Sequence, residues 1–507
     1  MGFKTSKPWA FILAVLLLAS HASAEPELSP ILQRHWFETR TAHFNIYSCG
    51  SNQQVARVGA RLEQFREAYS QLAGAQAVAS PPIVVLAFPD HAAMEPFLRL
   101  YQGKPANQAA FFLRGSDENF IALYLSGQGA DSLDAVFHEF THLLLRHNSL
   151  FWPMWLNEGM AEIYSTFETT SDGGIRIGKP HAIYLRLLAE RSWMSLPALF
   201  AVEHDSPDYN ERDRQGIFYA ESWLLTHYLM LGDNQAMKSR FGRLTVLLKQ
   251  GQAPEQAFTN AMGCSTGQME KQLHGYFERG KFQPLTFAVK ANLSAPQTMS
   301  ARPMTPVEVY FRLGDMLMRV ERPEEAAKYF QQAQKLAPKS PLPYEGLGLL
   351  AAQSNQSAQA LRQLKEALQL GSTSFLAHYI YAAERYRLTC KTPDMFTAVD
   401  EQTAAEIRGE LQKSLALMPN FGPAHRLLGF FLMVQGENMA EAEQHLQRAI
   451  QLEPENASYQ VTLAQIQTRK GNVEAARHTL EPLRLSYVAP EIRKRAEEML
   501  QALGPAK

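Results

Sequence analysis

The spacing of hydrophobic positions divides the chain into two parts with different periods. In the first part, apolar residues recur at helical spacing over 54–74, which predicts an amphipathic helix. The apolar runs at 81–88 and 119–125 are typical of buried strands, and residues 35–48 are predicted to form an extended pair. Strands and helices without strict alternation favour an α+β domain, which we place at residues 25–282.

The second part repeats itself every 34 residues. Small residues recur where two helices would cross, and large residues recur where they would fill the gap, as in tetratricopeptide (TPR) repeats. The matched positions are Tyr310, Leu313, Gly314, Ala326, Phe330 and Ala333, followed by Tyr344, Leu347, Gly348, Ala360, Leu364 and Ala367. We predict an all-α TPR solenoid over 307–503, with a capping helix at 489–503 and a protein partner on its concave face. The proline-containing segment 283–306 has no period and is predicted to be a linker.

The N-terminus has the pattern of an export signal. Lys4 and Lys7 precede an apolar run at 9–19, and Ala24 ends an A-x-A cleavage site. The run is shorter than the ~20 residues that span a bilayer, so we expect a signal peptide over 1–24 rather than an anchor. No later segment is apolar enough to be a transmembrane span. The mature protein is therefore expected in the periplasm or outside the cell.

Composition narrows the function without defining it. A formal net charge of -1 and the lack of a basic run argue against a nucleic-acid binder. The three cysteines, Cys49, Cys264 and Cys390, do not make a disulfide framework. A bond between Cys49 and Cys264 stays open at this point.

One stretch, "HEFTH" followed by "WLNEG", has the spacing of a metal site. His138 and His142 are four residues apart on a predicted helix, so both imidazoles leave the same face. Glu139 is placed to take a proton from a water molecule at the ion without being a ligand. Glu158 completes the three protein ligands of a catalytic Zn²⁺ site, whereas structural sites favour four Cys and His ligands. Glu162, one turn later, is placed to accept the other ring N–H of a ligating histidine.

These motifs resemble those of the gluzincin zinc metallopeptidases, in particular the peptidase MA-like family. The resemblance covers residues 35–280 and implies a zincin-like fold, Zn²⁺ bound by His138, His142 and Glu158, and Glu139 as the general base. It also implies a tyrosine that stabilises the oxyanion, and "FYAESWLLTHYL" nominates Tyr219. The gap between His142 and Glu158 is shorter than in the aminopeptidase N type. The element that binds a substrate's free amino end in that type is absent from the sequence, so endo- and exopeptidase both stay open.

Several of these residues also have a plain structural interpretation. Tyr219 could be a core aromatic residue, and Glu162 a solvated charge on a helix face. We expect His227, on the same segment as Tyr219, to be a core histidine with its hydrogen bonds satisfied. His147 and two tryptophans are expected to pack rather than react: Trp152 and Trp155.

The sequence therefore predicts an exported zinc-dependent peptidase whose repeats bind a partner or substrate. The strand 119–125, just before the motif helix, is expected to be the sheet edge on which an extended peptide is laid. The rival hypothesis is a non-catalytic TPR scaffold with a degenerate zincin domain that acts in envelope assembly. An intact base and an intact ligand set weigh against that rival, because a decayed site usually loses the base first.

Overall fold

The computed structural model describes residues 28–504 except 74–82, 102, 106–107, 116, 127–132, 147–151, 172, 204–205, 207–211, 233–234, 289–300, 390–396, 455 and 485–487. The predicted signal peptide lies outside the described residues, as do His147 and Cys390. Among the described helices, none combines the length and apolar character that a membrane crossing requires.

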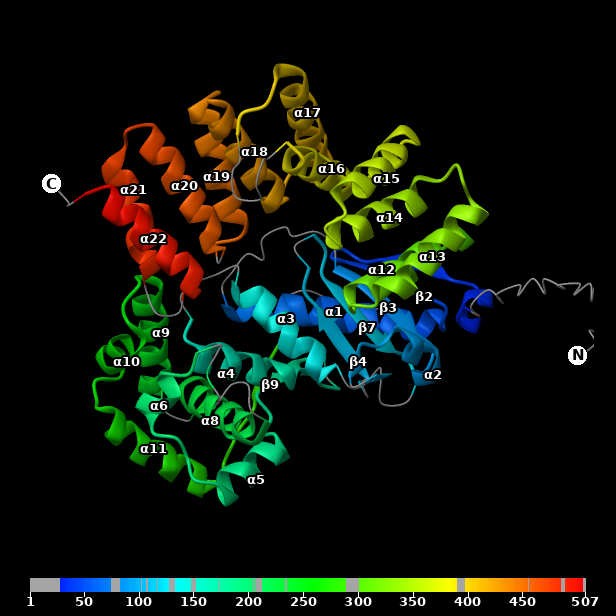
Figure 1. Cartoon of the computed structure of the whole chain (residues 1–507). Helices are drawn as coiled ribbons and strands as arrows, with labels where there is room; N and C mark the ends of the chain where they lie inside the picture. Colours follow the sequence, from blue (N-terminus) through cyan, green and yellow to red (C-terminus); the bar gives the residue numbers. More distant parts are fainter. Residues whose placement is uncertain are drawn as a thin grey trace, which may run out of the picture.

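A six-stranded sheet forms the centre of the N-terminal part (Figure 1). Its strands lie in the order β11, β1, β2, β3, β7, β6; β2, β3 and β7 run parallel, and the outer pairings are antiparallel. The bounds are β1 (Phe37–Arg40), β2 (Phe44–Ser48), β3 (Ile83–Phe88), β6 (Ala110–Leu113), β7 (Phe120–Tyr124) and β11 (Ala301–Pro303). The predicted extended pair and both buried strands are confirmed, and this part of the chain is an α+β domain.

Helices and two small sheets complete the domain. The helices are α1 (Asn52–Ala73), α2 (His91–Met94), α3 (Asp134–Arg146), α4 (Met154–Ser165), α5 (Ala182–Glu190), α6 (Leu196–Phe200), α8 (Arg212–Leu231), α9 (Gln235–Lys249), α10 (Pro254–Met262) and α11 (Thr266–Arg279). The short strands are β4 (Leu100–Tyr101), β5 (Lys104–Pro105), β8 (Glu168–Thr169), β9 (Ile175–Ile177) and β10 (Leu285–Phe287). The amphipathic helix predicted at 54–74 corresponds to α1.

The position of β7 corrects one prediction. We expected this strand at the edge of the sheet, but it pairs with β3 on one side and with β6 on the other. The edge strand next to the motif helix is β6, which contacts α3. The prediction of the edge strand was wrong because β6 is only four residues long, and its apolar run is too short to show a period.

The C-terminal part is an array of paired helices that arches over the N-terminal domain (Figure 1). The pairs are α12 (Pro306–Arg319) with α13 (Pro323–Leu336), α14 (Pro341–Gln353) with α15 (Ser357–Gln369), α16 (Phe375–Arg387) with α17 (Glu401–Leu417), α18 (Gly422–Gln435) with α19 (Met439–Leu452), and α20 (Ala457–Arg469) with α21 (Val473–Leu480). The final helix α22 (Pro490–Ala502) lies where the cap was predicted. Gly348 shows why small residues recur: a Cβ there would lie 2.6 Å from the Leu364 side chain.

The two parts share a hydrophobic core. All six side chains of β3 are buried, and alternate ones enter different clusters. Val85 and Ala87 pack in the cluster that contains residues of α1 and α3, whereas Leu86 and Phe88 pack with residues of α12 and α13. The first TPR pair is therefore a third layer on the sheet, opposite the motif helix, and this explains why β3 is apolar on both faces.

The segment 283–306 is consequently not the linker that we expected. Its described ends are strands: β10 pairs with β9, and β11 pairs with β1 as the outermost strand of the main sheet. The Arg302 guanidinium makes an ion pair with the buried Glu38 carboxylate on β1 and lies 2.9 Å from that of Glu308 on α12. A strand of three residues is too short to show a hydrophobic period, so it cannot be recognised in a sequence. The prediction of a linker therefore rested on the prolines of this segment.

Candidate metal centre

Helix α3 presents the two motif histidines on one face and packs its other face into the domain. The apolar side chains of that other face are buried, since Val136, Phe140 and Leu144 are at most 5% exposed. Phe137 stacks on Phe65 of α1 with 4.5 Å between ring centroids. This packing fixes the rotation of the helix, so the histidine face is held toward α4.

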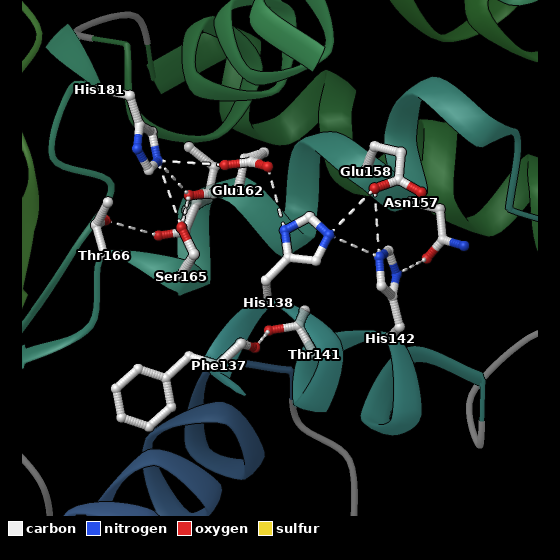
Figure 2. A network of polar contacts seen from close by, with 11 residues as sticks. Phe137, His138, Thr141, His142, Asn157, Glu158, Glu162, Ser165, Thr166 and His181 are labelled. Carbon is white, nitrogen blue, oxygen red and sulfur yellow. Dashed lines mark hydrogen bonds and ion pairs between the residues drawn. The ribbon is translucent and has the colours of Figure 1, made fainter. Parts of the chain in front are cut away.

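Helix α4 places Glu158 above α3. Gly159, the glycine of "NEG", allows α4 to take up this position. A Cβ on Gly159 would lie 2.1 Å from Thr226 Oγ1 and 2.4 Å from the Ser222 carbonyl oxygen of α8. Only a glycine therefore lets α4 approach α8 this closely. Glu158 itself is 2% exposed and points back toward α3 (Figure 2).

The three predicted ligands converge (Figure 2). The Nε2 atoms of His138 and His142 are 3.1 Å apart, and Glu158 Oε2 lies 3.3 Å from each of them. Ligands arranged tetrahedrally ~2.0–2.1 Å from a zinc ion are ~3.3–3.4 Å from one another. The three atoms thus match one face of such a tetrahedron and leave its fourth corner open. Within the part of the chain that the structure describes, no other cluster of potential ligands converges in this way.

The second nitrogen of each histidine is also held. His138 Nδ1 lies 3.2 Å from Glu162 Oε1, and His142 Nδ1 lies 3.2 Å from Asn157 Oδ1. When Nδ1–H donates to these oxygens, the lone pair of Nε2 faces the centre of the site. Glu162 is only 7% exposed, so the solvated-charge interpretation is wrong, and the predicted contact with a motif histidine is confirmed.

The ligands are strongly coupled electrostatically. Burial alone would lower the pKa of His138, but its hydrogen bonds to Glu158 and Glu162 outweigh this and raise the pKa to about 10. Burial alone would raise the pKa of Glu158, but hydrogen bonds from His138 and His142 lower it to about 2. The Glu158 carboxylate is therefore ionised, which is the form that can bind a cation, and a cation at this site would have to displace a proton from His138.

Of the two predicted catalytic residues, one is placed by the chain alone and the other by a ring contact. Glu139 is exposed on α3 and directly follows His138, so its carboxylate is open to solvent. The ring of Tyr219, on α8, is half-buried, and its centroid is 6.3 Å from that of His138. The structure therefore brings the three predicted ligands and Tyr219 together from three helices, and Glu139 is the chain neighbour of His138.

Sequence reasoning missed three residues of the centre. Asn157 directly precedes Glu158 in "WLNEG", and this adjacency was an available signal. His181 and Tyr184 both contact Glu162, but they come from the segment after β9 and no spacing rule connects them to the motif.

The residues that we expected to be structural behave accordingly. His227 is fully buried between the Tyr276 hydroxyl (2.8 Å) and the Gly178 carbonyl oxygen (3.0 Å), which confirms a satisfied core histidine. Trp155 packs against the aromatic rings of α6 and α10, and Trp152 packs on the same core. Cys49 and Cys264 are both free, so the disulfide that stayed open is not formed.

Comparison with known proteins identifies the repeats. Tetratricopeptide repeat family models match residues 307–340 and 435–496, and neither match extends into the α+β domain. The chain therefore carries TPR repeats, a module for protein interaction. No curated protein matches the chain.

Solved structures similar to this chain are also TPR proteins. YrrB, described as a TPR protein with an unusual peptide-binding site, has a TM-score of 0.31 and 18% identity, covering 38% of this chain and 90% of its own. A thermophilic TPR protein of Thermus thermophilus has a TM-score of 0.30 and 19% identity, covering 38% and 99%. PilF of Pseudomonas aeruginosa has a TM-score of 0.31 and 15% identity, covering 40% and 93%.

Proposed function

We propose that the protein is an exported zinc-dependent peptidase whose TPR repeats bind its substrate or a partner protein. One observation carries this proposal: three candidate ligand atoms lie 3.1–3.3 Å apart, as on one face of a zinc tetrahedron, and the exposed Glu139 follows one of these residues in the chain. A closed structural site would use a fourth protein ligand, and none converges here among the described residues.

His138, His142 and Glu158 would hold the ion. Zinc bound at such a site polarises a carbonyl group and lowers the pKa of a water molecule. Glu139 is not needed as a ligand, because the three convergent atoms come from other residues. Its exposed carboxylate is placed to accept the proton of the attacking water and to deliver it to the leaving amine.

Tyr219 would act on the carbonyl oxygen of the scissile bond. A phenol next to the His138 ring is placed to donate a hydrogen bond to the carbonyl oxygen as negative charge develops there. Its half-buried position restricts the ring without removing it from solvent. This arrangement of candidate ligands, base and phenol supports hydrolysis of an amide bond rather than an electron-transfer or storage function.

The outer side of β6 would align the substrate. It is the last strand of the sheet, it contacts α3, and no described strand pairs with its outer side. An extended peptide could add to this edge through main-chain hydrogen bonds, which favours unfolded segments of protein as substrates.

The deciding experiment measures metal and activity on the same purified protein. We expect about one zinc per chain and cleavage of a mixed peptide library, and we expect Glu139→Gln to keep the zinc and lose the cleavage. A metal-replete Gln variant with full activity would remove the proposed mechanism. Zinc without any hydrolysis would favour the rival, a non-catalytic TPR scaffold with a degenerate zincin domain that acts in envelope assembly.

A further inference from the structure

We propose that His181 and Tyr184 are positioning residues of the metal centre: they hold Glu162 so that it fixes the tautomer and orientation of His138. This inference rests on the proposed zinc site and extends it beyond the ligands. His181 Nε2 lies 3.3 Å from Glu162 Oε2, and the other oxygen, Oε1, faces His138 Nδ1 (Figure 2). Glu162 therefore bridges the two histidines.

Tyr184 adds a second hold on the same carboxylate. Its ring lies next to that of His181, with 4.9 Å between centroids, and burial together with the charge of Glu162 and a hydrogen bond to it raises the pKa of the phenol, so Tyr184 remains a donor. A carboxylate that receives donors from His181, Tyr184 and His138 has little freedom to rotate. The orientation of the His138 ring is thereby defined from the side opposite to the ion.

The segment that carries His181 is itself clamped. Thr166 Oγ1, just after α4, accepts the backbone N–H groups of Gly178 (2.9 Å) and Lys179 (3.0 Å). The Gly178 carbonyl oxygen accepts a hydrogen bond from buried His227 at 3.0 Å. Gly178 has φ +79°, and a Cβ there would lie 2.3 Å from Leu231, so only glycine fits. These contacts place His181 on a rigid support.

Other functions for His181 fit the contacts less well. Ser165 Oγ lies 3.4 Å from His181, but it approaches Nε2, the same nitrogen that faces Glu162. A nucleophilic triad needs the hydroxyl and the carboxylate on different nitrogens. The Ser165 hydroxyl also donates to the Glu162 carbonyl oxygen at 2.9 Å, which is a helix-end contact. The geometry points to support of Glu162.

The test compares zinc affinity in four variants, measured by competition with a chromophoric chelator. His181→Leu removes the donor and should weaken zinc binding by ~10–100-fold, the usual effect of losing an outer-shell partner. His181→Gln keeps an N–H at the same distance along the side chain and should restore most of the affinity. Tyr184→Phe should weaken binding to a lesser degree. His378→Leu is the control, because it breaks a histidine–glutamate pair of 2.5 Å in the TPR array.

A second readout separates positioning from general destabilisation. With Co²⁺ in place of zinc, His181→Leu should shift the visible absorption bands, and His181→Gln should return them toward the wild-type positions. If His181→Leu does not fold, Tyr184→Phe decides, because it deletes a single hydroxyl.

The outcomes are distinct from those of the proposed function. Wild-type zinc affinity and an unchanged Co²⁺ spectrum in a folded His181→Leu protein, or wild-type affinity in Tyr184→Phe where the Leu variant fails to fold, would overturn the inference alone. A wild-type protein that binds zinc but cleaves no peptide would overturn the peptidase and leave this inference standing. A wild-type protein without zinc affinity would overturn both.

Discussion

The Arg319 guanidinium on the first TPR helix lies 2.6 Å from the Asp117 carboxylate, at the turn between β6 and β7 of the α+β domain. Its guanidinium carbon is also 4.4 Å from the centre of the Phe120 ring on β7. Both partners are largely buried, and the contact lies at the edge of the core that the sheet shares with α12. The junction between the two parts is therefore an interior of the protein rather than a hinge.

This junction predicts where the chain can be cut. A protein ending at residue 290 would lose β11 and α12 and expose the apolar face of the sheet, so we expect it to aggregate. A protein ending at residue 371 keeps α12 to α15 and should be monomeric and folded. Size-exclusion chromatography and circular dichroism check both. A soluble, cooperatively folding 25–290 fragment would show that the shared core is dispensable.

Tyr219→Phe tests the oxyanion role. Removing one such donor typically lowers turnover by ~10²–10³-fold, and zinc content should not change. Tyr228→Phe is the matched control on the same helix, because its hydroxyl bonds Gln272 at 3.1 Å, and its loss should cost about 1 kcal/mol of stability without changing turnover. Equal turnover in wild type and Tyr219→Phe would assign Tyr219 to the core.

Gly159→Ala should damage the centre without touching a ligand. The added methyl group would overlap Thr226 of α8, so α4 has to move, with an expected cost of ~1–3 kcal/mol and weaker zinc binding. Gly242→Ala on α9 is the control: nothing lies within 4 Å of the new methyl group, and alanine is the better helix former. Thermal unfolding and zinc titration of both variants make the comparison.

Glu221 predicts a pH dependence of stability. Burial and the nearby Glu270 raise its pKa from 4.5 to about 8, although the Met194 N–H lowers it in part. Between pH 4.5 and pH 8 the folded state therefore holds a proton that the unfolded state releases. The protonated Glu221 contributes to the free energy of unfolding, and this stabilisation is complete below about pH 4.5 and is lost as pH rises toward 8.

Glu221→Gln keeps an oxygen for the Met194 N–H, whose present bond is 2.7 Å, but cannot ionise. The variant should lose less stability than wild type between pH 5.5 and pH 8.5 in thermal unfolding. Glu278→Gln, at an exposed site of α11, should keep the wild-type slope. A slope that Glu221→Gln leaves unchanged would mean that another group titrates.

The parts of the site that the sequence predicted are those set by local periodicity. His138, His142, Glu158 and Glu162 lie on two consecutive helices, where spacing of three or four residues decides which side chains share a face. His181 reaches Glu162 only through the pairing of β9 and the clamp at Thr166, and no pattern in the sequence encodes such a contact. The same limit hid β11, whose three residues gain their role from pairing with β1.

Chain order has a consequence for how the centre assembles. All three proposed ligands come from neighbouring helices, α3 and α4, whereas Tyr219 comes from α8 much later in the chain. Contacts between neighbouring segments close small loops and form early in folding. A newly synthesised chain would thus be able to bind the proposed zinc ion before the remaining helices dock, and would gain the proposed oxyanion donor only when α8 packs against α4.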